Sequence, residues 1–188
     1  MAIKIFIDQG HNPGTINGGA SGNGLSEEQV NFTVGSMLAD LLDSDPRFIV
    51  RTSRMFPQQV LGTSTTDSLH SRVDMANYWG ADYFISIHSN YNTNPSINGS
   101  EAYVYQRNSG AWYLGEDIVA GIVEQANMKD NFVRTNPSLY VLRATKMPAV
   151  LVELGYLSNA GDAQKLRDDP YSFAYGIYVG MLTYFNFA

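Results

Sequence analysis

The sequence predicts an α/β fold, a single layered domain with a mostly parallel twisted sheet flanked by helices. Short apolar runs alternate along the chain with segments whose apolar residues recur at helical spacing. This alternation favours strands and helices packed in layers. The chain has 188 residues, a length that suits one domain with its own buried core. No repeat, linker or low-complexity tail interrupts residues 1–188, so we expect one domain.

The first expected strand is the apolar run at residues 3–7, which ends in turn residues at 8–10. After a Gly-rich segment, the first helix is expected to begin near Ser26. Ser26 and Gln29 have the spacing of a capping box, and apolar residues then repeat at helical spacing. The remaining expected elements are strands at 48–52, 83–87, 101–106 and 149–153, and helices at 69–79, 112–127 and 171–185.

Composition and charge exclude several kinds of partner and site. The net charge is −6 and Lys and Arg form no cluster, which argues against nucleic acid and against an anionic membrane surface as partners. The chain has no cysteine, so a metal site would have to use histidine and carboxylate ligands. No apolar stretch is long enough to span a membrane, and residues 1–8 do not form a signal peptide. An exported form would therefore carry its leader outside this chain.

Two of the three histidines occupy similar places in the expected fold. His11 follows the first strand, and His88 follows the strand at 83–87. Ligand sites in α/β sheets gather at the carboxyl ends of the strands, so the two imidazoles are expected to share one cleft. The alternative is that each histidine simply bonds to a nearby carbonyl group.

A hydrolytic zinc site commonly adds one carboxylate to two histidines and leaves one position open. Glu27 lies in the first turn of the expected helix and shares the inward-facing stripe of Val30 and Val34. Glu28 is rotated from it by about 100° and should face away. The alternative reading of Glu27 is an acid that stabilises the helix N-terminus through the macrodipole, and the two readings are compatible.

Glu153 stands at the end of the very apolar run 148–152. Partial desolvation should raise the pKa of this carboxyl toward the range useful for a general base. The alternative is a buried ion pair with Arg143 or Arg134.

Four separated segments of the chain resemble the catalytic domain of the zinc-dependent N-acetylmuramoyl-L-alanine amidases. Their order and spacing also fit, and weaker matches at 68–77 and 140–149 extend the similarity over nearly the whole chain. The four segments are 5–11 (IFIDQGH), 24–27 (GLSE) followed by Asn31, 85–90 (ISIHSN) and 150–159 (VLVELGYLSN).

The resemblance implies that His11, Glu27 and His88 are the zinc ligands, with one zinc ion per chain, and that Glu153 is the catalytic acid and base. Arg143 and Asn90 are candidate substrate contacts. The sequence departs from the family at Gln9, where proline is usual, and at Asn12, where glycine is common. The segment Met55–Thr66 is longer than usual and is expected to form part of the cleft rim. His70 matches no ligand and is expected on the surface, and exposed rings at Tyr91 or Tyr105 are candidates for stacking on sugars.

The function implied by the resemblance is hydrolysis of the amide bond between N-acetylmuramic acid and L-alanine in bacterial peptidoglycan, during cell wall lysis or remodelling. Two alternatives stay open: a zinc hydrolase that cuts another amide, such as a peptidase, and a wall-binding module without activity. Peptidoglycan is the expected partner, in the cell wall or outside the cell. An autolysin, a sporulation or germination enzyme and a phage lysin all fit, and the sequence favours no oligomeric state.

Overall fold

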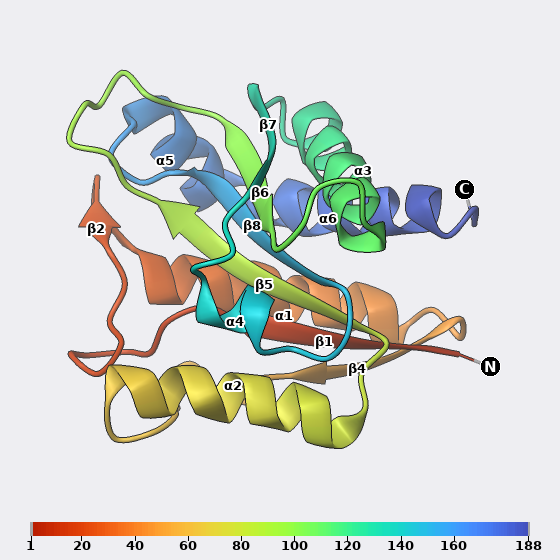
Figure 1. The fold of residues 1–188 in the computed structure, drawn as a ribbon. Helices are drawn as coiled ribbons and strands as arrows, with labels where there is room; N and C mark the ends of the chain where they lie inside the picture. Colours follow the sequence, from red (N-terminus) through yellow and green to blue (C-terminus); the bar gives the residue numbers. More distant parts are fainter. Residues whose placement is uncertain (1, 188) are drawn as a thin grey trace.

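The computed structural model describes residues 2–187, in which six strands form one sheet in the order β4-β1-β5-β8-β6-β7 (Figure 1). The four strands of the parallel part are β1 (Ile3–Gln9), β4 (Phe48–Thr52), β5 (Tyr83–Asn90) and β8 (Ala149–Tyr156). The strand β6 (Ser100–Val104) is antiparallel to β8, and β7 (Asp130–Thr135) is parallel to β6. The predicted class, a mostly parallel sheet flanked by helices, is confirmed.

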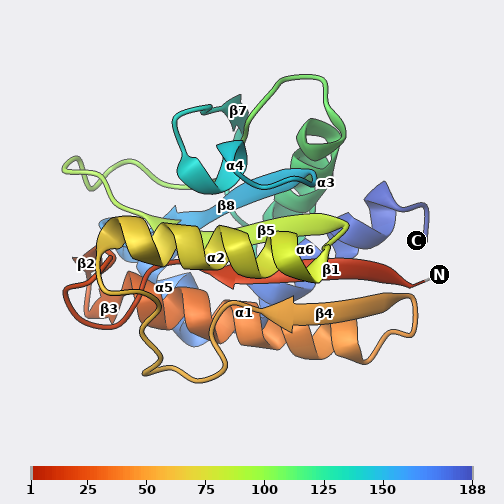
Figure 2. The same cartoon turned by 60° about the horizontal axis from the view of Figure 1, so that its bottom comes forward.

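Helices cover both faces of this sheet (Figures 1 and 2). Successive side chains of a strand point to opposite faces, so Ile5 and Ile7 of β1 enter one buried cluster while Phe6 enters the other. The first cluster contains residues of α1 (Glu27–Asp43), α3 (Gly110–Gln125) and α6 (Pro170–Tyr184). The second contains residues of α2 (Thr65–Trp79) and the short α4 (Tyr140–Arg143). The helix α5 (Ala160–Asp168) contacts β8.

The start of α1 differs from the prediction in one respect. Ser26 is the N-cap residue, but its side chain makes no capping hydrogen bond, so the predicted capping box is wrong. Ser26 lies in a two-stranded hairpin of β2 (Ser21–Gly22) and β3 (Leu25–Ser26), and this pairing sets its backbone. The first helical amide, that of Glu27, instead donates to the carbonyl of Ala20 at 2.9 Å. The residue that precedes β2 therefore supplies an acceptor for one of the free amides at the start of α1.

The topology brings the carboxyl ends of β1, β5 and β8 to one edge of the sheet, where they are neighbours in the order of strands. His11 lies just beyond β1, and His88 and Glu153 lie in the carboxyl-terminal halves of β5 and β8. Within residues 2–187, no helix has the length and apolar character needed to cross a membrane.

Candidate active site

His11, Glu27 and His88 converge on one point. Glu27 Oε1 lies 3.1 Å from His11 Nε2 and 3.1 Å from His88 Nδ1. One ligand atom from each residue can be chosen so that no two are more than 4.8 Å apart. In a tetrahedral zinc site with bonds of about 2.0–2.1 Å, ligand atoms are roughly 3.3 Å apart. The three side chains can thus hold one zinc ion with small adjustments.

The loop that carries His11 is held by a buried arginine of α2. His11 has a positive φ of 65°, which is unusual for a residue other than glycine and persists only where the surroundings enforce it. Arg72 forms an ion pair with Asp8 at 2.6 Å, and both side chains are 1% exposed. Its guanidinium also donates to three acceptors in the loop: Gln9 O (2.6 Å), His11 O (2.5 Å) and Asn12 Oδ1 (2.9 Å).

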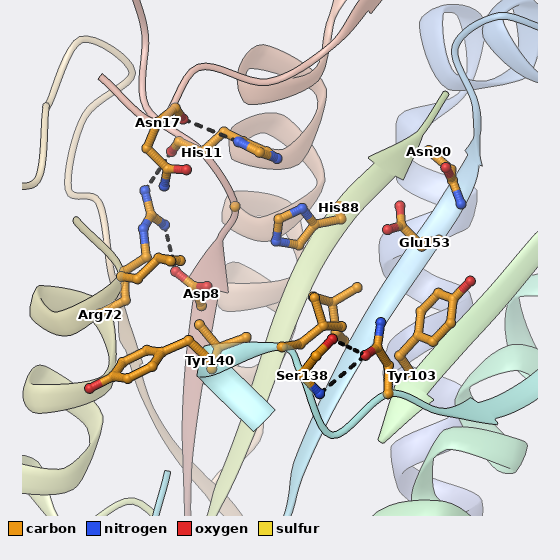
Figure 3. Close-up of a pocket in the computed structure, with 16 residues that line it drawn as sticks. Asp8, His11, Asn17, Arg72, His88, Asn90, Tyr103, Ser138, Tyr140 and Glu153 are labelled. Atoms are coloured by element: carbon orange, nitrogen blue, oxygen red, sulfur yellow. Dashed lines mark hydrogen bonds and ion pairs between the residues drawn. The ribbon is translucent and has the colours of Figure 1, made fainter. Parts of the chain in front are cut away.

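The ring of His11 is oriented by a backbone acceptor. His11 Nδ1 lies 3.1 Å from the carbonyl oxygen of Asn17. When Nδ1 carries the proton and donates it there, the lone pair of Nε2 is free to face Glu27 and a metal ion. Figure 3 shows this contact at the edge of the cavity.

Gln9 and Asn12, the two departures from the family pattern, are both buried. Gln9 Oε1 accepts a hydrogen bond from the amide of Arg54 at 2.9 Å. Asn12 exchanges hydrogen bonds with Leu61, donating to its carbonyl at 2.9 Å and accepting from its amide at 3.2 Å. The segment Met55–Thr66 thus supports the His11 loop. None of the described residues that line the cavity belongs to this segment, so the expectation that Met55–Thr66 forms part of the cleft rim is wrong.

Glu27 rather than Glu28 lies beside the histidines, as the helical phase predicts. The carboxylate of Glu27 also accepts hydrogen bonds from the amides of Ala20 (2.9 Å) and Ser89 (3.2 Å). Burial alone would raise the pKa of Glu27, but hydrogen bonds and charges from His11 and His88 hold it well below its ordinary value. Glu27 is therefore an ionised and firmly positioned ligand candidate.

The position of the His88 ring depends on Gly10, which directly follows β1. A Cβ atom on Gly10 would lie 2.4 Å from His88 Nε2 and 2.7 Å from the carbonyl oxygen of Ile87. A side chain at that position would have to displace both the imidazole and the backbone of β5 at Ile87. The glycine therefore leaves the space that the His88 ring occupies.

Glu153 lies between an imidazole and a second carboxylate. In the sheet register it is paired with His88 on β5 and with Glu101 on β6. Its Oε2 atom is buried and has no hydrogen-bond partner within residues 2–187. Burial raises the pKa of Glu153 well above its ordinary value, and the negative charges of Glu27 and Glu101 raise it further.

The two arginines considered as partners of Glu153 are engaged elsewhere. Arg134 Nε lies 3.4 Å from Glu101 Oε2. Arg143 donates to the carbonyl of Ser138 at 3.3 Å and lies over the ring of Tyr140. The ion-pair alternative for Glu153 therefore finds no support in the described part of the chain.

A cavity of about 520 Å³ opens beside these groups (Figure 3). Its polar wall includes His11, His88, Glu153 and Asn90, whose Nδ2 donates to Glu101 Oε1 at 3.0 Å. Arg143 does not line the cavity, and His70 is exposed, as expected. Tyr91 and Tyr105 are each 49% exposed and also lie outside the cavity lining. The opposite wall is largely apolar and is formed by Leu69, Tyr103, Leu139, Tyr140, Val141 and Leu151.

Glu101 is a site residue that the sequence did not reveal. It is 2% exposed and accepts hydrogen bonds from Asn90 and from the hydroxyl of Tyr156 at 2.8 Å. A glutamate that begins an expected strand reads as an ordinary edge residue. Its partners Asn90, Tyr156 and Arg134 come from three different strands, so no local pattern could have indicated its burial.

Two histidines and a glutamate around one point, beside a cavity at the carboxyl ends of parallel strands, define the kind of site used by metal-dependent hydrolases. The family model described as N-acetylmuramoyl-L-alanine amidase matches residues 5–183, and the chain belongs to this family.

Relatives agree with this assignment. The chain is 36% identical to N-acetylmuramoyl-L-alanine amidase CwlM of Bacillus licheniformis, over 98% of this chain and 69% of that protein. It is also 36% identical to the amidase LytC of Bacillus subtilis (strain 168), over 97% of this chain but only 35% of that protein, which is much longer.

Solved structures show the same fold. The N-acetylmuramoyl-L-alanine amidase from Clostridium difficile 630 superposes with a TM-score of 0.87 at 28% identity, covering 98% of this chain and 97% of that one. The catalytic domain of the amidase CwlV from Bacillus (Paenibacillus) polymyxa var. colistinus gives a TM-score of 0.85 at 29% identity, covering 99% of both chains.

Proposed function

We propose that this chain is a zinc-dependent hydrolase that cuts the amide bond between N-acetylmuramic acid and L-alanine in peptidoglycan. One observation carries the proposal: His11, Glu27 and His88 meet within 4.8 Å beside a cavity that Glu153 also lines. Membership of the amidase family supports the choice of substrate. The site of action would be the cell wall, reached from outside the cell or, for a phage lysin, at lysis.

The donor set suits zinc. Two imidazole nitrogens and one carboxylate oxygen are the ligands of many hydrolytic zinc sites, and the cavity leaves a fourth position open to water and substrate. The described residues offer one such group of His, Asp and Glu side chains, which supports one ion per chain. When bound, zinc supplies a positive charge that polarises the scissile carbonyl and makes water more acidic.

Glu153 is the proposed general base and then general acid. It takes a proton from the attacking water while the water oxygen bonds to the carbonyl carbon. The carbon–nitrogen bond then breaks, and Glu153 delivers the proton to the departing amine nitrogen. The products are a carboxylate on the lactyl group and a free amino group on L-alanine. Burial raises the pKa of this carboxyl, which makes its carboxylate form a stronger base toward the proton of water.

The remaining cavity residues position the substrate. Asn90 lines the cavity close to Glu153 (Figure 3) and remains a candidate substrate contact. Arg143 was a second candidate, but it points to a separate surface pocket with Tyr105 and Met147. The largely apolar wall opposite the imidazoles suits the uncharged backbone and methyl groups that flank the scissile bond.

Product analysis of digested cell wall tests the proposal. Purified wall treated with the protein should acquire free L-alanine amino termini and no new reducing sugar ends, because cleavage of a glycosidic bond normally needs a pair of carboxylates across the sugar. A chelator should abolish the reaction and zinc should restore it. New reducing ends would identify a glycosidase, cleavage at another peptide bond would identify a peptidase, and an intact wall would identify a binding module.

A further inference from the structure

The buried carboxylate of Glu101 anchors an exposed arginine. Its Oε1 accepts hydrogen bonds from Asn90 and Tyr156, and its Oε2 lies 3.4 Å from Arg134 Nε. The Glu101 side chain is 3% exposed, whereas that of Arg134 is 59% exposed. An ionised carboxylate at such depth needs a cationic partner, and the arginine meets this need with its Nε atom.

The outer part of the Arg134 guanidinium remains available. Within residues 2–187, the guanidinium forms no hydrogen bond, and its ion pair with Glu101 involves the Nε atom and neither terminal nitrogen. An arginine held at Nε presents its two terminal nitrogens as a planar fork. This geometry matches the two oxygens of a carboxylate.

Arg134 lies on the side of β7 that faces the cavity. Val133, the residue before it, is buried in the first cluster, so the side chain of Arg134 points to the other face of the sheet. Asn136, the residue that follows β7, lines the cavity. Tyr103, the cross-strand partner of Arg134 on β6, also lines it. The arginine therefore lies at the edge of the cavity, one strand beyond Tyr103 and Glu101.

The distance fits a group just beyond the scissile bond. β7 is two strands away from β8, and the register places Arg134 level with Leu151, two residues before Glu153. About 10 Å across the strands and about 7 Å along them separate the backbones of Arg134 and Glu153 by roughly 12 Å. Two residues of extended peptide span about 7 Å, and the arginine side chain covers the remainder. A peptide leaving the Glu153 region along the sheet would pass the guanidinium at its second residue.

The charged groups inside the cavity are already paired or are acidic, which leaves Arg134 to bind an anionic group of the substrate. Arg72 lines the cavity, but its guanidinium donates to Asp8, to backbone carbonyls and to Asn12. Asp8 and Glu153 add acidic groups to the lining. An anionic part of the substrate would therefore be bound at the edge rather than inside.

We propose that Arg134, anchored by Glu101, binds a carboxylate on the residue that follows L-alanine in the stem peptide. This inference rests on the proposed amidase function, because it assigns the peptide side of the substrate to the β6–β7 edge. It makes Arg134 a specificity residue. Substrates in which that carboxylate is replaced by a primary carboxamide would lose the charge-assisted contact.

The test uses two synthetic muramoyl dipeptides that differ only in a free carboxylate or a carboxamide on the second residue, with zinc-loaded protein. The parent should have the lower KM for the carboxylate compound. Arg134→Gln should raise that KM about tenfold, the effect of losing one charge-assisted hydrogen bond at a partly exposed site. It should leave the KM for the carboxamide and both kcat values nearly unchanged. Arg107→Gln, which removes an exposed arginine beside Trp112, is the matched control and should change nothing.

Several outcomes would overturn the inference while leaving the amidase proposal intact. The first is that the parent has equal KM values for the two compounds. The second is that Arg134→Gln raises the KM for both compounds equally, as a purely structural role would give. The third is that Arg143→Gln, and not Arg134→Gln, abolishes the preference for the carboxylate compound. Failure of the parent to cleave either compound or cell wall would instead overturn the proposed function itself.

Discussion

The carboxyl groups of Glu27 and Glu153 differ in how their charges are matched. Glu27 contacts both His11 and His88 and accepts two backbone amides as well. Glu153 has a buried oxygen with no hydrogen-bond partner among residues 2–187 and lies next to Glu101 in the sheet. This difference supports the two proposed roles: the candidate ligands hold one another in place, whereas the candidate base has a carboxyl oxygen that no neighbour occupies.

The largest expected effect follows from removing a ligand. His11→Ala, Glu27→Ala and His88→Ala should each lose zinc and activity together, by more than the 10–100-fold that loss of an outer-sphere partner typically costs. Zinc content, thermal melting and wall hydrolysis should be measured on the same preparations. Glu28→Ala is the control and should keep both metal and activity. Retention of stoichiometric zinc by Glu27→Ala would remove that residue from the ligand set.

A smaller effect on metal binding is expected from the arginine that holds the His11 loop. Arg72→Gln leaves Asp8 buried without its ion-pair partner, so it should cost about 3–5 kcal/mol of unfolding free energy. It should also weaken zinc binding by about 10–100-fold. Arg72→Lys should recover part of the stability but little of the zinc affinity, because one ammonium group cannot replace the planar fork that reaches Gln9 and His11.

Urea unfolding and zinc titration separate these two effects. If Arg72→Lys bound zinc as tightly as the parent, Arg72 would contribute charge alone and not the geometry of the loop.

The smallest of the metal-side effects is expected at Gly10. Gly10→Ala should displace the His88 ring and lower the affinity for zinc. It should also lower the free energy of unfolding by about 1–3 kcal/mol, as overpacking usually does. Gly14→Ala is the matched control, because a Cβ at Gly14 meets no atom within 4 Å although the φ of +83° disfavours alanine. Gly14→Ala should therefore lose some stability but no zinc affinity. Equal zinc affinities of the two variants would contradict the role of Gly10.

The sequence predicted the positions of His11, Glu27, His88 and Glu153 far better than it predicted the β6–β7 edge of the sheet. His11, Glu27 and His88 stand beside apolar runs or in a helix with clear phase, so local patterns placed them. The strand at 48–52 was predicted with its observed bounds, and β5 and β8 were predicted with correct starts but ends three residues short. β5 continues through the polar residues 88–90, and β8 continues past the charged Glu153 through residues 154–156, so a search that stops at the first polar or charged residue ends both strands too early.

The β6–β7 edge could not be predicted in the same way. Residues of β7 are mostly exposed and their sequence, DNFVRT, has no apolar alternation, so this strand was missed. The antiparallel direction of β6 also has no local signal, and it is this direction that places Glu101 opposite Glu153. The helix α5 was missed because its sequence is largely polar. Its N-cap residue is Asn159, whose side chain accepts hydrogen bonds from the amides of Gly161 and Asp162.

The most direct test of the proposed division of roles is a joint measurement of zinc content and turnover in Glu153→Gln. Glutamine keeps the shape of the side chain but cannot accept a proton from water. The variant should bind zinc and melt like the parent or at a higher temperature, while turnover of cell wall falls by roughly 10²–10⁴, the usual contribution of general acid–base catalysis. Full activity would show that Glu153 is not the base, and loss of zinc would make it a ligand and reopen the assignment of Glu27.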